Sequence, residues 1–181
     1  MKAVSQPALL HGGGRAVNPS VSHEMGEKLR QRRHTRLDAR LYAEPDAICS
    51  VTIGTRDRRA FFSSAAVAAA TIEVLQAHSA KTGVKVYGFC VMPDHVHLVV
   101  SPSAECDIIT FVGQFKNLAQ RAVWQTGVDG RIWQTSFWDH FLRKDEDVER
   151  VVNYVLDNPV RKGLVTERKD HQFAGSLVFD L

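Results

Sequence analysis

The chain has 181 residues, of which 44% are hydrophobic and 24% are charged, with a formal net charge of +3. This composition is typical of a folded globular protein with a sizeable core and does not favour a largely disordered chain. No apolar run reaches transmembrane length and the N-terminus lacks the apolar core of a secretion signal, so we predict a soluble cytoplasmic protein without membrane association.

The charge is unevenly distributed along the chain. Residues 1–40 hold eight basic and three acidic side chains, a balance of +5, whereas residues 41–181 hold fifteen basic and seventeen acidic ones. Residues 1–22 show no hydrophobic period, so we expect 1–40 to be a basic, largely flexible arm and 41–181 to be one domain. Such an arm suits a polyanionic partner, because neutralised phosphates release counterions, although a solvated leader would have the same composition.

The three cysteines do not show the pattern of a cross-linked or zinc-binding framework. Cys49, Cys90 and Cys106 are an odd number and lack paired ligand spacing. We therefore predict reduced core thiols and no disulfide.

Two segments with different periodicity open the predicted domain. A β-branched run over residues 48–53 lies between Pro45 and Gly54 and predicts a first strand. An apolar stripe rich in alanine then predicts a helix that is capped by Ser63 or Ser64 and runs to about residue 80.

The next part of the chain predicts two strands, over about 84–91 and 95–101, joined by a Met-Pro-Asp turn. Side chains alternate along a strand, so His95 and His97 share one face of the second strand. The intervening valines and leucine share the other face, which we expect helices to cover. Two titratable rings in an otherwise hydrophobic strand need a reason to be there, and a metal ion is the simplest one.

The second half of the domain continues with helices and short strands. Apolar residues at spacings of three and four predict a helix from about Asp107, and two aromatic segments between 132 and 143 predict short strands. A last helix is predicted from an N-cap at Asp145 to the pair Asn158-Pro159, which ends it. The whole order predicts an α+β fold with an antiparallel sheet packed with helices.

Two polar residues stand out on that last helix. At about 100° per residue, Tyr154 falls on the flank of the buried apolar stripe. Asn158 lies four residues on, one turn above Tyr154 on the same flank at the rim of the core. The helix could therefore present both groups over the sheet face that carries His95 and His97.

Each of these features has a common structural explanation when it is taken alone. A His-x-His pair on a strand is more often a surface pair or a satisfied core pair than a metal site. A tyrosine at a core edge usually packs with its hydroxyl in water, and an asparagine before proline can be a helix terminator. The combination of all four residues is much less expected by chance.

The residues around these positions resemble a known family. Residues 91–100, VMPDHVHLVV, resemble the His-hydrophobic-His motif of the HUH endonucleases, in the form carried by single-tyrosine transposases. The second block of the REP-associated tyrosine transposases is similar to Trp133-Gln134, Phe137-Trp138-Asp139, Arg143 and residues 154–165. The resemblance extends over roughly residues 48–179.

This resemblance implies a fold, a reaction and a cofactor. The fold is the HUH nuclease domain, which is ferredoxin-like. His95, His97 and Asn158 match the ligands of a divalent metal ion, magnesium or manganese, and Tyr154 matches the nucleophile. The implied substrate is single-stranded DNA with REP-like palindromic hairpins, which is cut beside the hairpin through a 5′-phosphotyrosine intermediate. The family also implies a monomer, with a dimer left open.

DNA contacts are expected from basic side chains in several parts of the chain. The polar face of the helix from Asp107 could follow a phosphate backbone, although a solvated outer face would look the same. Together with the arm and the second block, the expected DNA-binding residues are Arg32, Arg33, Arg36, Lys116, Arg121, Arg143 and Arg161.

Three other functions are compatible with parts of this pattern. A hairpin-binding protein that does not cut would keep the fold, but all four catalytic positions are filled, which favours an enzyme. A replication or conjugation nickase is a closer alternative, although the block from Tyr154 to Pro159 resembles transposases more. A generic His-x-His metallohydrolase would leave Tyr154 unexplained.

Overall fold

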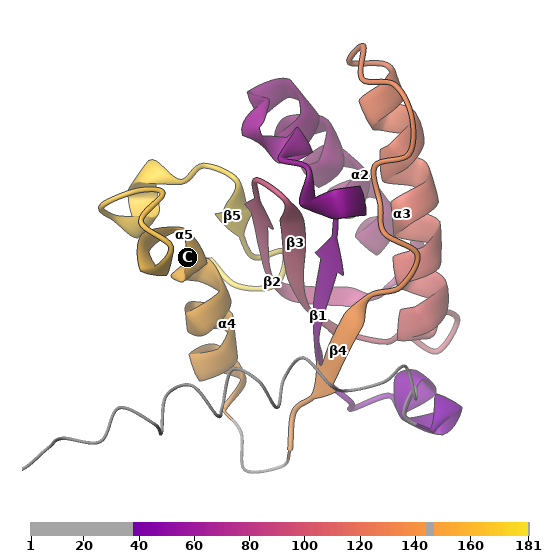
Figure 1. The fold of residues 1–181 in the computed structure, drawn as a ribbon. Coiled ribbons are helices and arrows are strands. Elements are labelled where there is room, and N and C mark those ends of the chain that lie inside the picture. The colour runs from indigo at the N-terminus through magenta and orange to yellow at the C-terminus, as the bar shows by residue number, and fades with distance from the viewer. Residues whose placement is uncertain (1–37, 144–146, 181) are drawn as a thin grey trace, which may run out of the picture. The chain divides into compact units, whose positions relative to one another are not determined.

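Five strands form one antiparallel sheet within the residues that the computed structural model describes, 38–143 and 147–180. Their order across the sheet is β4-β1-β3-β2-β5 (Figure 1). The strands are β1 (Cys49–Gly54), β2 (Lys85–Met92), β3 (His95–Ser101), β4 (Trp138–Phe141) and β5 (Ala174–Gly175). The predicted α+β class and the two strands around the Met-Pro-Asp turn are confirmed.

The described residues belong to one unit, which begins at Asp38. Asp38 caps a short 3-10 helix, η1 (Ala39–Ala43), by accepting a hydrogen bond of 3.0 Å from the backbone N–H of Arg40. The rest of the predicted basic arm lies outside the described residues, with the three arginines that were expected there to contact DNA.

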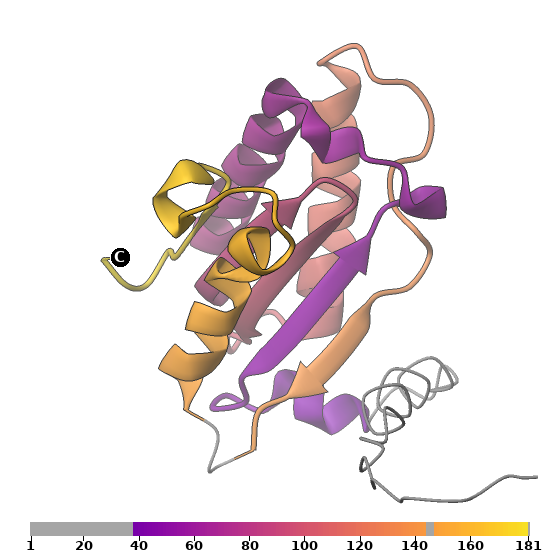
Figure 2. The ribbon, with the colours of Figure 1, turned by 60° about the vertical axis from the view of Figure 1, so that its left-hand side comes forward.

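Two long helices cover one face of the sheet. α2 (Ala65–Thr82) starts after the extended Ser64 and ends at Gly83, whose φ of 71° is a left-handed conformation that glycine adopts without strain. α3 (Ile108–Trp124) is capped by Asp107, whose carboxylate accepts a hydrogen bond of 2.9 Å from the backbone of the first turn. Figure 2 shows both helices behind the sheet.

The main hydrophobic core lies between these helices and the sheet. Val96, Leu98 and Val100 of β3 have no exposed area and pack into this core, to which α3 contributes Phe111 and Phe115. Burial of each such side chain contributes roughly 1.5–3 kcal/mol. The predicted covering of this face of β3 by helices is confirmed.

A shorter helix, α4 (Val148–Leu156), packs on the opposite face over β2 and β3 (Figures 1 and 2). A Cβ at Gly88 of β2 would lie 3.1 Å from Cγ1 of Val152, so the missing side chain allows α4 to approach the strand closely. This second apolar cluster consists of Cys90, Met92, Val99, Val152, Val155 and Leu156.

Both ends of the last helix differ from the prediction. Its N-cap is Asp147, whose carboxylate accepts a hydrogen bond of 2.9 Å from the first turn, and the predicted cap Asp145 lies outside the described residues. After α4 a second short helix, α5 (Asn158–Arg161), follows at once. Asn158-Pro159 starts this helix rather than ending one, because proline lacks only an N–H that the first helical turn leaves unused.

Neither a disulfide nor a membrane-spanning helix is found among the described residues. All three cysteines are buried and none forms a disulfide. Burial is the main cause that raises the pKa of Cys49 and of Cys90 to about 12, so both thiols stay protonated at neutral pH. No helix in this part of the chain has the length and apolar character that crossing a bilayer requires.

Candidate active site

Two imidazole rings stand side by side at the start of β3. The Nε2 atoms of His95 and His97 are 2.9 Å apart, and the ring planes are nearly perpendicular at 88°. Both rings lie on the sheet face that α4 covers, the same face to which β3 contributes Val99. This confirms the predicted sharing of one face by the two histidines.

A polar side chain lies within hydrogen-bond distance of the Nδ1 atom of each ring. Nδ1 of His95 lies 2.5 Å from Oδ1 of Asp94, and Nδ1 of His97 lies 3.0 Å from Oγ1 of Thr52. An ionised carboxylate can only accept, so Asp94 favours the tautomer of His95 that has its proton on Nδ1 and a lone pair on Nε2. Histidines that bind metals have such partners in most proteins.

The hydroxyl of Thr52 allows His97 two tautomers, because it can donate or accept. When Thr52 donates, His97 carries its proton on Nε2 and donates it to His95. When Thr52 accepts, two Nε2 lone pairs face each other and repel unless a cation binds both. Two nitrogens about 2.1 Å from one octahedral ion would be about 3.0 Å apart, so the observed separation fits a shared cation.

The environment of His97 keeps its ring neutral. The pKa of His97 is lowered to about 4, mainly by burial; the neighbouring His95 and Lys162 act in the same direction, and Asp94 opposes them. The neutral ring is the form whose lone pair binds a metal. His97 is therefore available as a ligand at neutral pH.

Tyr154 lies near the end of α4, the helix that packs on this sheet face, and Asn158 begins α5. The side-chain Nδ2 of Asn158 donates to the carbonyl oxygens of Tyr154 at 3.1 Å and of Val155 at 3.2 Å, which leaves Oδ1 as the acceptor that it can offer a cation. Both residues were expected at the rim of the core. Tyr154 has 52% of its surface exposed, whereas Asn158 is buried with only 6% exposed.

Two cations at the end of α5 belong to this site. The guanidinium of Arg161 lies 4.4 Å from the centroid of the Tyr154 ring, a cation–π contact. Lys162 is close enough to lower the pKa of His97. Positive charge beside a nucleophile attracts a phosphate group. The sequence interpretation selected Arg161 and missed Lys162, although the two are adjacent in the chain.

The C-terminal segment fixes the helix that carries Tyr154. Arg168 donates to Oδ1 of Asn153 at 3.0 Å and to Oδ1 of Asp157 at 2.7 Å. The same segment is attached to β2 through β5 and through His171, whose Nε2 lies 3.0 Å from the carbonyl oxygen of Val91. The C-terminal segment therefore ties α4 to the sheet.

The other described residues that were predicted to bind DNA lie on α3 and just after β4. Lys116 of α3 donates to the carbonyl oxygens of Gln134 and Thr135 at 2.8 and 3.0 Å. Arg121 is exposed on α3, which covers the opposite face of the sheet, and Arg143 is exposed just after β4. Contacts of these residues with DNA remain predictions.

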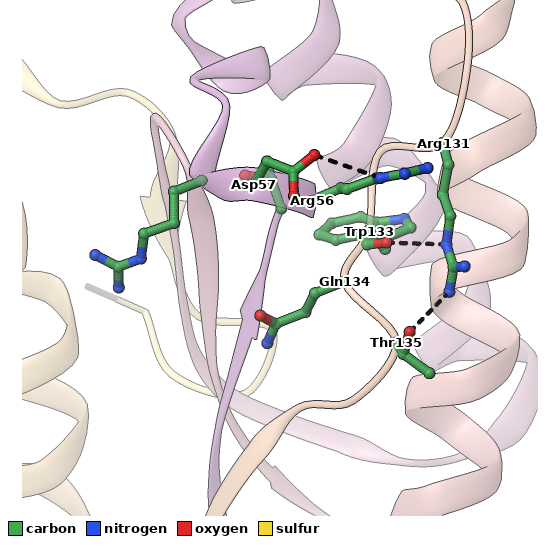
Figure 3. Close-up of a pocket in the computed structure, with 8 residues that line it drawn as sticks. Arg56, Asp57, Arg131, Trp133, Gln134 and Thr135 are labelled. Atoms are coloured by element: carbon green, nitrogen blue, oxygen red, sulfur yellow. Dashed lines mark hydrogen bonds and ion pairs between the residues drawn. The ribbon is translucent and has the colours of Figure 1, made fainter. Parts of the chain in front are cut away.

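A pocket that the sequence interpretation missed adjoins the end of β1 (Figure 3). Its volume is about 520 Å³. Two features of the sequence could have indicated this pocket, a charged turn at Arg56–Arg59 and the Trp133-Gln134 pair. Trp133 forms only an isolated β-bridge to Thr55 rather than the predicted strand. The pocket is lined by Thr55, Arg56, Asp57, Arg58, Arg131, Trp133, Gln134 and Thr135.

Comparisons with known proteins give a consistent result. A family model described as "Transposase IS200 like" matches residues 46–158. A REP-associated tyrosine transposase of Escherichia coli (strain K12) is 28% identical over 91 residues, which are 50% of this chain and 53% of that protein. A protein of Haemophilus influenzae, whose name is the same but marked as provisional, is 28% identical over 96 residues, 47% of this chain and 54% of that protein. The chain thus spans about half the length of these relatives.

One solved structure supports the fold. A REP-associated tyrosine transposase bound to a REP hairpin has a TM-score of 0.61 with this chain and covers 78% of it, while this chain covers 81% of that structure. The sequence identity is 24%, so the likeness concerns the arrangement of the sheet and helices. The predicted fold class is confirmed.

Proposed function

The chain belongs to the family of IS200-like transposases, and on this premise we propose that it cuts and rejoins single-stranded DNA beside palindromic hairpins. REP-like hairpins are the proposed substrate, because two relatives are named for REP elements and a protein of the same fold is bound to a REP hairpin. The observation that supports the chemistry is the packing of α4, with its exposed Tyr154, on the sheet face that bears His95 and His97.

Tyr154 is the nucleophile in this proposal. Its hydroxyl oxygen attacks the phosphorus of the scissile phosphate, the bond from phosphorus to the 3′-oxygen breaks, and the hydroxyl proton reaches the leaving oxygen through solvent. The products are a 5′-phosphotyrosine and a free 3′-hydroxyl. Because one phosphodiester replaces another, the 3′-hydroxyl can reverse the reaction or a different strand end can take its place.

The remaining site residues position the phosphate. His95, His97 and Asn158 would hold a divalent cation, magnesium or manganese, which supplies positive charge against the non-bridging oxygens. The two imidazoles with fixed partners and one amide oxygen leave coordination positions for substrate. Arg161 and Lys162 attract the same phosphate from the side of α5.

The proposal is tested with hairpin oligonucleotides labelled at the 3′ end and incubated with manganese or magnesium. A 5′-phosphotyrosine retains the 3′ fragment, so the wild-type protein should become labelled and Tyr154→Phe should not. Tyr87→Phe is the matched control, because Tyr87 packs on Phe179 with ring centroids 5.8 Å apart and should leave labelling unchanged.

Two results would contradict the proposal in different ways. Labelling of Tyr154→Phe at the wild-type rate would show that another residue is the nucleophile. Hairpin binding by the wild-type protein without labelling, with either metal, would assign it to the hairpin-binding proteins that do not cut.

A further inference from the structure

The pocket of Figure 3 is linked to the histidine pair through hydrogen bonds of Asp94. Its walls come from the turn after β1 and from residues 131–135 before β4. Thr55 donates to the carbonyl oxygen of Asp94 through its N–H at 2.9 Å and through its hydroxyl at 3.0 Å. Asp94 in turn holds Nδ1 of His95. One wall of the pocket and the first histidine therefore share a partner.

The carboxamide of Gln134 lies between the pocket and the histidines. A Cβ at Gly54 would lie 2.9 Å from Oε1 of Gln134, so this amide occupies the space that a side chain at position 54 would need. Gly54 pairs with His95 in the β1–β3 ladder, and paired positions project to the same face. The amide therefore lies on the histidine face, one strand away from His95, and Figure 3 shows it directed toward β1.

The pocket carries a surplus of positive charge. Arg56, Arg58 and Arg131 face one acid, Asp57, which is bound to Arg56 at 3.4 Å. Arg131 is oriented by hydrogen bonds to its own loop, with its Nε 3.1 Å from the carbonyl oxygen of Trp133 (Figure 3). One guanidinium group can donate two parallel hydrogen bonds to two oxygens of a phosphate, so the lining suits a phosphate diester.

The backbone of the arginine turn is strained. Asp57 and Arg58 have φ values of 56° and 54°, and both are residues with a Cβ that disfavours this conformation. Strained backbone of this kind persists where the surrounding structure imposes it, commonly at ligand sites. Here it forms the tight turn η2 (Arg56–Arg58), which carries two of the three lining arginines.

We propose that this pocket binds the nucleotide that adjoins the scissile phosphate, an inference that rests on the proposed function. Arg56 and Arg58 contact the phosphates, and Gln134 makes hydrogen bonds with the edge of the base. A carboxamide offers a donor and an acceptor at fixed spacing, which distinguishes one base from another. The volume of about 520 Å³ is in the range of small-ligand sites, so about one nucleotide fits.

The phosphate contacts are tested by binding, in a Tyr154→Phe background that prevents cutting. Two hairpins are compared, one with a single-stranded flank and one without. Replacing Arg56 and Arg58 together by glutamine should weaken binding of the flanked hairpin and lower the slope of log affinity against log salt by about 0.7 for each lost contact. Binding of the hairpin without a flank should not change.

Lys85→Gln is the matched control for charge. Lys85 is exposed and pairs with Ser101 at the end of the sheet opposite His95, so its loss should affect both hairpins equally or not at all. Equal weakening of both hairpins by the double arginine variant would overturn the pocket assignment, because the arginines would then act as general surface charge.

The base contact is tested with four flanked hairpins that differ only in the base next to the cut. The affinities of the Tyr154→Phe protein for the hairpins with the best and the worst base should differ by about fivefold or more. Adding Gln134→Ala should remove that difference. An unchanged preference would overturn the role of Gln134. If the wild-type protein is labelled and the pocket variants bind as before, the pocket assignment alone would be overturned. If the protein binds no hairpin at all, both the pocket assignment and the proposed function would be overturned.

Discussion

The two faces of the central sheet bury histidine in opposite ways. On the side of α2 and α3, His78 of α2 is 4% exposed, its ring is stacked on Phe111 of α3 with centroids 4.6 Å apart, and its Nε2 lies 3.2 Å from the carbonyl oxygen of Phe111. On the face under α4, His95 and His97 have a carboxylate and a hydroxyl as partners and their Nε2 atoms face each other. The first histidine is packed against an aromatic ring, and the other two form a polar pair.

The difference follows from what covers each face. α2 and α3 have 18 and 17 residues, whereas α4 has nine. His95 and His97 are only partly buried beside this short helix, and Tyr154 of α4 is exposed. Burial alone therefore does not assign a role to a histidine. The role follows from the partner of one ring nitrogen and from the access of a ligand to the other.

The largest effect is expected from His97→Ala on the site face. Loss of a metal ligand should reduce cutting by at least about 10³-fold, which corresponds to the several kcal/mol that a cation contributes to phosphoryl transfer. The unfolding free energy should change by about 1 kcal/mol or less, because the ring is not part of the main core. Cutting assays and urea denaturation measure both quantities. A protein that fails to fold would show that this histidine is structural.

The adjacent residue on the other face should respond in the opposite way. Leu98→Ala removes a side chain with no exposed area from the main core and should lower the unfolding free energy by about 2–5 kcal/mol. The folded fraction should cut at the wild-type rate, which is measured at low temperature with the folded fraction determined by circular dichroism. Loss of cutting by fully folded Leu98→Ala would show that the two faces are not independent.

An intermediate effect is expected at the partner of His97. Thr52→Val removes the hydroxyl that lies 3.0 Å from Nδ1, and should weaken manganese binding by about 10- to 100-fold, as loss of such partners does in metal sites. Thr52→Ser keeps the hydroxyl and should bind manganese nearly as the wild type does. Calorimetric titration measures the affinity. Equal affinities of the two variants would rule out the proposed role of the hydroxyl.

The smallest effect is expected from the packed histidine. Burial lowers the pKa of His78 from its ordinary value of 6.5, so near and below that pH the unfolded chain binds this proton more readily than the folded chain does. His78 therefore contributes stability that is complete above pH 6.5 and is lost as the pH falls. His78→Gln keeps an N–H donor without a titrating ring and should flatten the fall of the urea midpoint below pH 6.5. An unchanged pH profile would contradict this.

Much of the histidine face could be predicted from local pattern. The alternation of β3 places His95 and His97 together, and the four-residue spacing keeps Asn158 against the Tyr154 carbonyl even though α5 begins there. The burial of Asn158 was not predictable, because it depends on how closely α4 approaches the sheet. That approach depends on Gly88, which faces Val152 from a distant part of the chain.

The sequence by itself determined the antiparallel α+β class, the face that the two histidines share and the pairing of Tyr154 with Asn158, since each depends on the repeat of a strand or a helix. Only the tertiary structure decided which groups complete the site. Thr52, Lys162 and Gln134 come near the histidines through strand pairing and helix docking, and residues so far apart in the chain share no local period that would reveal their contact.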